Sequence, residues 1–257
     1  MQVREAEGVS AERLGRIGPV LRAEVDKGTF PGAVSLVARN GRVVHFEATG
    51  YLDAAKTKPM TKDTIFRLAS MTKPLVSVAA MMLVEQGVMK INDPISNWLP
   101  ELKDLKFETA AGDVAPARAV TVQDLLRHTA GMVGTAEDYL KFLQMMANGG
   151  EYAGRRYLSK KTVEFMLSDH TPGMGGTTFA STGPGYGFGL GFAVRAQDGF
   201  AWTPGSKGDA MWAGAWGTSF WIDPKEKLVG LLMTQSPSNR VQTRMLFKNL
   251  VYAAVVE

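Results

Sequence analysis

Apolar positions along the chain fall into runs of two kinds. Apolar residues at helical spacing predict helices over 9–26, 64–87 (after an opening turn), 120–127, 135–148, 159–167 and 239–256. Short β-prone runs predict strands over 33–38, 43–48, 187–194, 215–222 and 228–234. Asn40-Gly41 lies between the first two strands and is a strong hairpin signal, so these strands are expected to be antiparallel.

The order of the runs predicts the fold class. One helix is followed by two strands, several helices, three strands and a closing helix. Strands segregated from helices predict an α/β chain of the α+β arrangement, with an antiparallel β-sheet flanked by helices. A chain of 257 residues can bury a single sizeable core, and no repeat or long linker divides it. We therefore expect one domain over 1–257.

Composition and charge exclude several classes of function. The chain carries 29 Lys and Arg against 25 Asp and Glu, and this net charge of +4 is too small and too dispersed to indicate a nucleic-acid partner. It has no cysteine, which excludes disulfides, thiolate metal sites and cysteine nucleophiles. There is no long apolar segment and no apolar signal core at the start, so we expect a cytoplasmic protein without a membrane partner. Histidines and carboxylates do not cluster, and neither a metal nor a cofactor is expected.

Ser70-Met71-Thr72-Lys73 is the first candidate for chemistry. A Ser and a Lys at i and i+3 share one helix face, and Pro74 belongs in the first turn, so the helix should begin at about Ser70 or Met71. Ser70 would then be a nucleophile whose own N–H serves as an oxyanion donor. Lys73 would be its base if desolvation lowers its pKa. With 12 Ser and 15 Lys in the chain, about one such spacing arises by chance, so the tetrapeptide alone is a weak signal.

Wider segments strengthen this interpretation. Five blocks, in order, are Ile65–Pro74 (IFRLASMTKP), Asp93–Pro100 (DPISNWLP), Val120–Gly131 (VTVQDLLRHTAG), Gly134–Tyr139 with Asn148-Gly149-Gly150, and Gly217–Pro224 (GTSFWIDP). Together they resemble the serine β-lactamase and penicillin-binding-protein superfamily, specifically its class C-like carboxylesterase branch, the family VIII esterases. The resemblance implies a β-lactamase/transpeptidase-like fold. It places a helical part, over 70–131, between the N-terminal strands and the C-terminal sheet strands.

The same resemblance assigns the substrate strand. Lactamases of the family carry Lys-Thr/Ser-Gly beside the nucleophile, whereas the matching stretch here is Trp212-Ala213-Gly214. The esterase branch often has Trp-x-Gly at this place, and losing the Lys removes a cation suited to a substrate carboxylate. We therefore take Trp212, Ala213 and Gly214 as substrate-binding residues that favour esters over β-lactams, although packing of Trp212 on a sheet face is an equal alternative. The second oxyanion donor, beside Ser70, would be the Ala215 N–H.

One departure from the family concerns the region after the His128-Thr129-Ala130-Gly131 block. The family has a long, largely helical segment here that carries a Tyr-x-Asn or Tyr-Ser motif, and its Tyr assists proton transfer. In this chain Gly131 is followed almost directly by Gly134. The helical subdomain should be reduced and the site shallow and wet, which weakens electrostatic catalysis. Tyr139 and Tyr186 are the only substitutes we consider, and core packing is the favoured role for both.

These observations lead to one hypothesis and several alternatives. The chain is expected to be a serine hydrolase that cleaves a small-molecule carboxylic ester through an acyl-enzyme on Ser70, with Lys73 as base and with reduced activity. The alternatives are a β-lactamase, D-peptidase or acyltransferase of the same superfamily, or a catalytically incomplete scaffold or ligand-binding module. A monomer or weak homo-oligomer is expected, because apolar surface left by the missing segment favours self-association.

Overall fold

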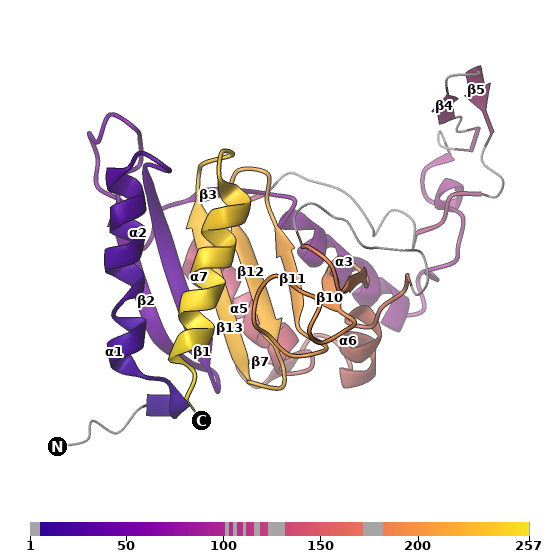
Figure 1. Ribbon diagram of the computed structural model, residues 1–257. Helices are drawn as coiled ribbons and strands as arrows, with labels where there is room; N and C mark the ends of the chain where they lie inside the picture. Colours follow the sequence, from indigo (N-terminus) through magenta and orange to yellow (C-terminus); the bar gives the residue numbers. More distant parts are fainter. Residues whose placement is uncertain are drawn as a thin grey trace.

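A seven-stranded antiparallel sheet forms the centre of the protein (Figure 1). The computed structural model describes residues 6–100, 103–104, 107–109, 112–115, 119–122, 132–171 and 182–256. The strand order is β2-β1-β13-β12-β11-β10-β9. The strands are β1 (Gly32–Arg39), β2 (Arg42–Gly50), β9 (Tyr186–Phe188), β10 (Ala193–Arg195), β11 (Ala210–Ala213), β12 (Ser219–Asp223) and β13 (Leu228–Thr234). Because β1 pairs with β13, strands from the N-terminal and C-terminal parts of the chain lie side by side in one sheet.

Helices cover both faces of this sheet. On one face lie α1 (Ala11–Leu14), α2 (Ile17–Asp26) and α7 (Arg240–Ala254), with α7 crossing in front of the sheet in Figure 1. On the other face lie α3 (Thr72–Glu85), α5 (Ala136–Ala147) and α6 (Lys160–Met166). The predicted fold class, an antiparallel sheet flanked by helices, is confirmed.

Two hydrophobic cores result from the alternation of side chains along the strands. In β1, Val34 and Leu36 belong to the core under α3 and α5, whereas Ala33 and Val37 belong to the core under α2 and α7. Successive residues of a strand point to opposite faces. Every residue of β1 is therefore buried, and a residue's parity in its strand decides which core it enters.

Several predicted boundaries differ from the structure. The helix predicted over 9–26 is two helices, because Gly15, a poor helix former, ends α1. The strand predicted over 187–194 is two strands, β9 and β10, joined by a turn in which Gly189 N donates to Phe192 O. The strand predicted over 215–222 begins only at Ser219, since residues 214–218 form a turn that follows β11. Gly217 has φ +111°, which extended strands do not accept.

The segment around the nucleophile block also differs. A short strand, β3 (Phe66–Ala69), precedes α3 and pairs with β6 (Met132–Gly134). The other short elements are the 3-10 turns η1 (Ala6–Gly8) and η2 (Ile95–Asn97), β4 (Phe107–Thr109) with β5 (Gly112–Val114), and β7 (Glu151–Tyr152) with β8 (Arg155–Arg156). Most of the helix predicted over 120–127 and of the loop before Tyr186 lies outside the described residues, so a helical part over 70–131 stays a prediction. No helix within the described ranges is long and apolar enough to cross a bilayer.

Candidate active site

Ser70 lies at a sharp junction between a strand and a helix. Strand β3 pairs irregularly between Arg67 and Ala69, and Ala69 has φ +48°, a left-handed conformation that non-glycine residues rarely adopt. The Met71 N–H donates to Leu68 O at 3.0 Å, and α3 begins at Thr72, one or two residues later than predicted. Bulges and strained backbone of this kind concentrate at functional sites, and the junction holds Ser70 just ahead of the helix.

Lys73 is buried in the first turn of α3. Its side chain is 2% exposed, and its Nζ lies 6.0 Å from the centroid of the Trp212 ring. None of the ion pairs between described residues involves Lys73. Burial lowers the pKa of Lys73, because a desolvated ammonium is disfavoured. A lowered pKa is the condition under which Lys73 can act as a base.

The end of β11 and the turn after it lie against the segment before Ser70. A Cβ on Gly214 would collide with Leu68 O and Thr218 Oγ1, so only glycine allows this approach. Thr218 Oγ1 donates to the same Leu68 oxygen at 3.3 Å. Residues 68–73 and 212–218, which are far apart in the sequence, therefore lie against each other.

Trp212 is packed in the core and also faces Lys73. It is 7% exposed and packs edge-to-face on Phe188, with ring centroids 5.0 Å apart. The same ring faces Lys73. Ala213 is also buried, whereas Ala215 is exposed. Neither the Ser70 N–H nor the Ala215 N–H donates a hydrogen bond to a described residue, which leaves both available to a ligand oxygen.

Tyr139 reaches the turn that follows Ser70, a contact that the sequence analysis missed. Its hydroxyl donates to Met71 O at 2.8 Å, and its ring packs against Phe142 and Phe220. The side chain is 3% exposed, and burial raises its pKa well above the usual value. Tyr139 is thus a neutral donor held in the core. Apolar spacing along α5 indicated its burial but gave no sign of the hydrogen bond.

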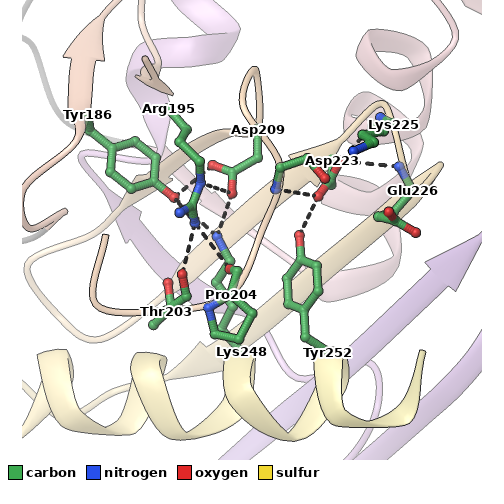
Figure 2. Close-up of polar contacts among 11 residues, drawn as sticks. Tyr186, Arg195, Thr203, Pro204, Asp209, Asp223, Lys225, Glu226, Lys248 and Tyr252 are labelled. Atoms are coloured by element: carbon green, nitrogen blue, oxygen red, sulfur yellow. Dashed lines mark hydrogen bonds and ion pairs between the residues drawn. The ribbon is translucent and has the colours of Figure 1, made fainter. Parts of the chain in front are cut away.

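Tyr186 belongs to a second buried polar cluster, shown in Figure 2, on the α7 side of the sheet. Asp209 accepts hydrogen bonds from Tyr186 Oη (2.7 Å), Arg195 Nε (2.9 Å) and Lys248 Nζ (3.0 Å). Burial lowers the pKa of Lys248, and the Asp209 carboxylate opposes this shift. The Asp209 carboxylate is compensated by the charges of Arg195 and Lys248. The cluster therefore has a structural role and connects β9, β10 and the start of β11 to α7.

A second carboxylate extends this cluster. Asp223 accepts from Tyr252 Oη at 2.7 Å and from the backbone N–H groups of Ser206, Lys225 and Glu226 at 3.1–3.2 Å. In Figure 2, Lys248 and Tyr252 both extend from α7 towards the sheet. The sequence carried no local signal for the cluster, because its members are spread over nearly seventy residues and converge only through the fold.

The two described histidines, His45 and His170, form contacts elsewhere. His45 Nε2 lies 2.7 Å from Ser35 Oγ, and burial, together with the charge of Lys62, lowers the pKa of His45 to about 4. His170 Nε2 lies 2.7 Å from Phe165 O. His128 lies outside the described residues. Within the described part of the chain, no three His, Asp or Glu side chains form a group that could hold a metal ion.

The sequence matches a known family model and several known proteins. A family model described as Beta-lactamase matches residues 19–134 and 130–253. The two matches meet where the sequence analysis placed the shortened segment. Protein Rv1367c of Mycobacterium tuberculosis is 42% identical over 117 residues, which are 44% of this chain and 29% of that protein. Esterase EstB of Burkholderia gladioli is 36% identical over 123 residues, which are 48% of this chain and 30% of that protein. The match thus spans less than a third of either relative.

The fold has counterparts among solved structures. One is EstCE1, described as a hydrolase with promiscuous acyltransferase activity. It superposes with a TM-score of 0.77 at 20% identity, and the match covers 94% of this chain and 99% of that one. At this identity the likeness concerns the fold alone.

Proposed function

This chain belongs to the Beta-lactamase family, and on that premise we propose that it is a serine hydrolase that cleaves small carboxylic esters through an acyl-enzyme on Ser70. The observation that carries the proposal is the state of Lys73. It is buried in the first turn of α3, three residues after Ser70, has no ion pair with a described residue, and has a pKa lowered by desolvation. A buried amine without a carboxylate partner is suited to accept a proton from a hydroxyl.

The proposed reaction uses only groups of this chain and water. Lys73 Nζ accepts the Ser70 hydroxyl proton while Ser70 Oγ attacks the ester carbonyl carbon. The oxyanion that forms accepts hydrogen bonds from the Ser70 and Ala215 N–H groups. Lys73 then gives its proton to the leaving alkoxide, and the alcohol departs from the acyl-enzyme. A water molecule attacks the acyl carbon and passes a proton to Lys73, which returns one to Ser70 Oγ as the acid leaves.

Trp212, Ala213 and Gly214 give this proposal its ester preference. The strand beside Ser70 lacks the Lys of the lactamase triad, so it offers no cation for a β-lactam carboxylate at this place. Trp212 instead shields Lys73 from water on the strand side. The relative EstB is an esterase by name, in keeping with a neutral ester as the substrate.

Acyl transfer is the second candidate within the same mechanism. EstCE1, which shares the fold, is described as having promiscuous acyltransferase activity. The acyl-enzyme on Ser70 would be the same, with an alcohol replacing water as the acceptor. An open site, expected from the shortened segment, would admit both acceptors. Nitrocefin turnover distinguishes a β-lactamase from both, and ester formation with added alcohol distinguishes transfer from hydrolysis.

The test is labelling with a fluorophosphonate, read by intact mass, together with hydrolysis of p-nitrophenyl acetate. We expect one adduct and turnover in the wild-type protein. In Ser70→Ala both should be lost, with the rate falling at least about a thousandfold. Ser168→Ala, just beyond α6, is the matched control and should behave as wild type. A folded wild-type protein that takes up no label would overturn the proposal and favour a scaffold or ligand-binding module.

The remaining expectations concern the whole protein. A small-molecule ester is the proposed partner. The cytoplasmic location and the monomeric or weakly oligomeric state remain proposals. Light scattering at increasing concentration tests the last of these, and a stable higher oligomer at low concentration would contradict it.

A further inference from the structure

Arg244 of α7 approaches the proposed oxyanion turn from the opposite face of the sheet. Its side chain is 7% exposed. Its Nη2 donates to Gly214 O and, at 3.3 Å, to Thr218 O. No ion pair between described residues involves Arg244. The guanidinium charge is therefore directed at two backbone carbonyls rather than at a carboxylate.

These two carbonyls close the turn that contains Ala215. Gly214 N donates to Thr218 O at 2.8 Å, and Gly217 N donates to Gly214 O at 3.1 Å. The Trp216 carbonyl accepts from Ser236 N at 2.7 Å. The turn is thus held by hydrogen bonds at the carbonyls of Gly214, Trp216 and Thr218. Arg244 links the first and last of these residues, Gly214 and Thr218.

The Gly214 carbonyl and the Ala215 N–H belong to the same peptide unit. A trans peptide is planar, and its C=O and N–H point in opposite directions. When Arg244 binds Gly214 O from the α7 side, the Ala215 N–H is turned towards the other side, where α3 and Ser70 lie. A cation on the carbonyl also polarises the peptide and strengthens its N–H as a donor.

We propose that Arg244 is a positioning residue that orients and polarises the Gly214–Ala215 peptide for the oxyanion. The inference rests on the proposed function, in which the Ala215 N–H binds the oxyanion. Arginine suits this task because one NH2 group of its planar guanidinium donates to both carbonyls, whereas lysine offers a compact point charge. No sequence motif assigns Arg244, which lies some thirty residues after the turn.

Arg39 provides a control elsewhere in the protein, although its guanidinium also pairs with the Glu226 carboxylate at 3.2 Å. It is also 7% exposed. Its guanidinium also binds backbone carbonyls: Glu226 O (3.0 Å), Glu7 O (3.0 Å) and Gly8 O (2.7 Å). Removing either arginine takes one donor away from buried carbonyls and should lower stability. Only Arg244 contacts the turn, so the two variants separate positioning from general stabilisation.

The experiment compares Arg244→Met, Arg244→Lys and Arg39→Met with wild type. Loss of one oxyanion donor costs about a hundredfold or more in kcat. We therefore expect Arg244→Met to slow p-nitrophenyl acetate turnover and fluorophosphonate labelling about a hundredfold, with KM nearly unchanged. The rates of Arg244→Lys should lie between those of wild type and Arg244→Met. The rates of Arg39→Met should stay within about threefold of wild type, at a temperature where all variants are folded. Low-millimolar guanidinium should restore part of the rate in Arg244→Gly.

A second readout does not depend on catalysis. Hydrogen exchange at the Gly214 and Gly217 amides should be slow in wild type and Arg39→Met, and faster in Arg244→Met. If Arg244→Met keeps slow exchange and full rate, or if both Met variants lose activity alike, the positioning role is overturned. If wild type does not react at all, the proposed function fails. In that case, hydrogen exchange at the Gly214 and Gly217 amides still tests whether Arg244 stabilises the turn. Exchange that is unchanged in Arg244→Met would overturn the positioning role as well.

Discussion

Lys73 and Lys248 are two buried lysines on opposite faces of one sheet, and their surroundings differ in kind. Lys248 donates to Asp209 at 3.0 Å and to Tyr186 Oη at 3.2 Å (Figure 2). Lys73 faces the Trp212 ring and has no ion pair with a described residue. Burial lowers the pKa of both, but a carboxylate opposes the shift only at Lys248.

The difference separates a structural charge from a chemical one. A buried ion pair with complete hydrogen bonds fixes neighbouring elements, and breaking it leaves a charge without compensation. A buried amine without a carboxylate is costly as an ammonium and is therefore inclined to be neutral. The first arrangement joins α7 to the sheet, and the second suits the proton transfer proposed beside Ser70.

The sharpest way to break this comparison is to replace each lysine by methionine. Lys73→Met should lower ester hydrolysis at least about a thousandfold and leave stability unchanged or raised, because a desolvated amine is removed. Lys248→Met should lower the free energy of unfolding by about 3 kcal/mol, because Asp209 loses a charged partner. Urea unfolding measures the stability of each variant, and hydrolysis of p-nitrophenyl acetate measures its activity. If Lys73→Met destabilised the protein as much as Lys248→Met, Lys73 would be a structural charge too.

The pH dependence of labelling sharpens the comparison further. Proton transfer needs neutral Lys73, and the neutral fraction rises as pH rises through its pKa. Because burial lowers this pKa from 10.5, the fluorophosphonate rate should rise with pH and level off below pH 10.5. The free energy of unfolding should also rise with pH. The buried ammonium destabilises the folded protein most at low pH, and this destabilisation disappears as pH approaches 10.5.

Trp212→Ala supplies the variant for this test. Without the ring, water reaches Lys73, its pKa rises, and the labelling profile should move to higher pH. Trp212→Phe keeps an apolar ring and should shift the pH profile of labelling less. A profile that stays in place in Trp212→Ala would mean that another residue sets the pKa of the base.

The smallest expected effect concerns Tyr139. Tyr139→Phe removes the donor to Met71 O and should lower the free energy of unfolding by about 1–2 kcal/mol, because a buried carbonyl loses its partner. Labelling should slow only a few-fold, with an unchanged midpoint of the pH profile. A shifted midpoint would instead show that Tyr139 takes part in proton transfer.

Local pattern predicted the elements whose signals are short-range. The Asn40-Gly41 hairpin and the α5 helix with its Thr135 cap follow from turn chemistry and helical spacing. Strand limits were less well predicted between 187 and 222, because β9, β10 and β11 are short and buried among glycine-rich turns. There the tertiary pairing, and not the run of β-prone residues, decides where a strand ends.

The sequence by itself determined the fold class, the Asn40-Gly41 hairpin and the resemblance to the family. The tertiary structure decided that Lys73 is enclosed against Trp212, that Tyr139 supports Met71 O, and that Arg244 holds the Gly214 carbonyl. The physical reason is range. Spacing and capping act between near neighbours in the chain, whereas desolvation and charge compensation depend on residues that only the folded sheet brings together.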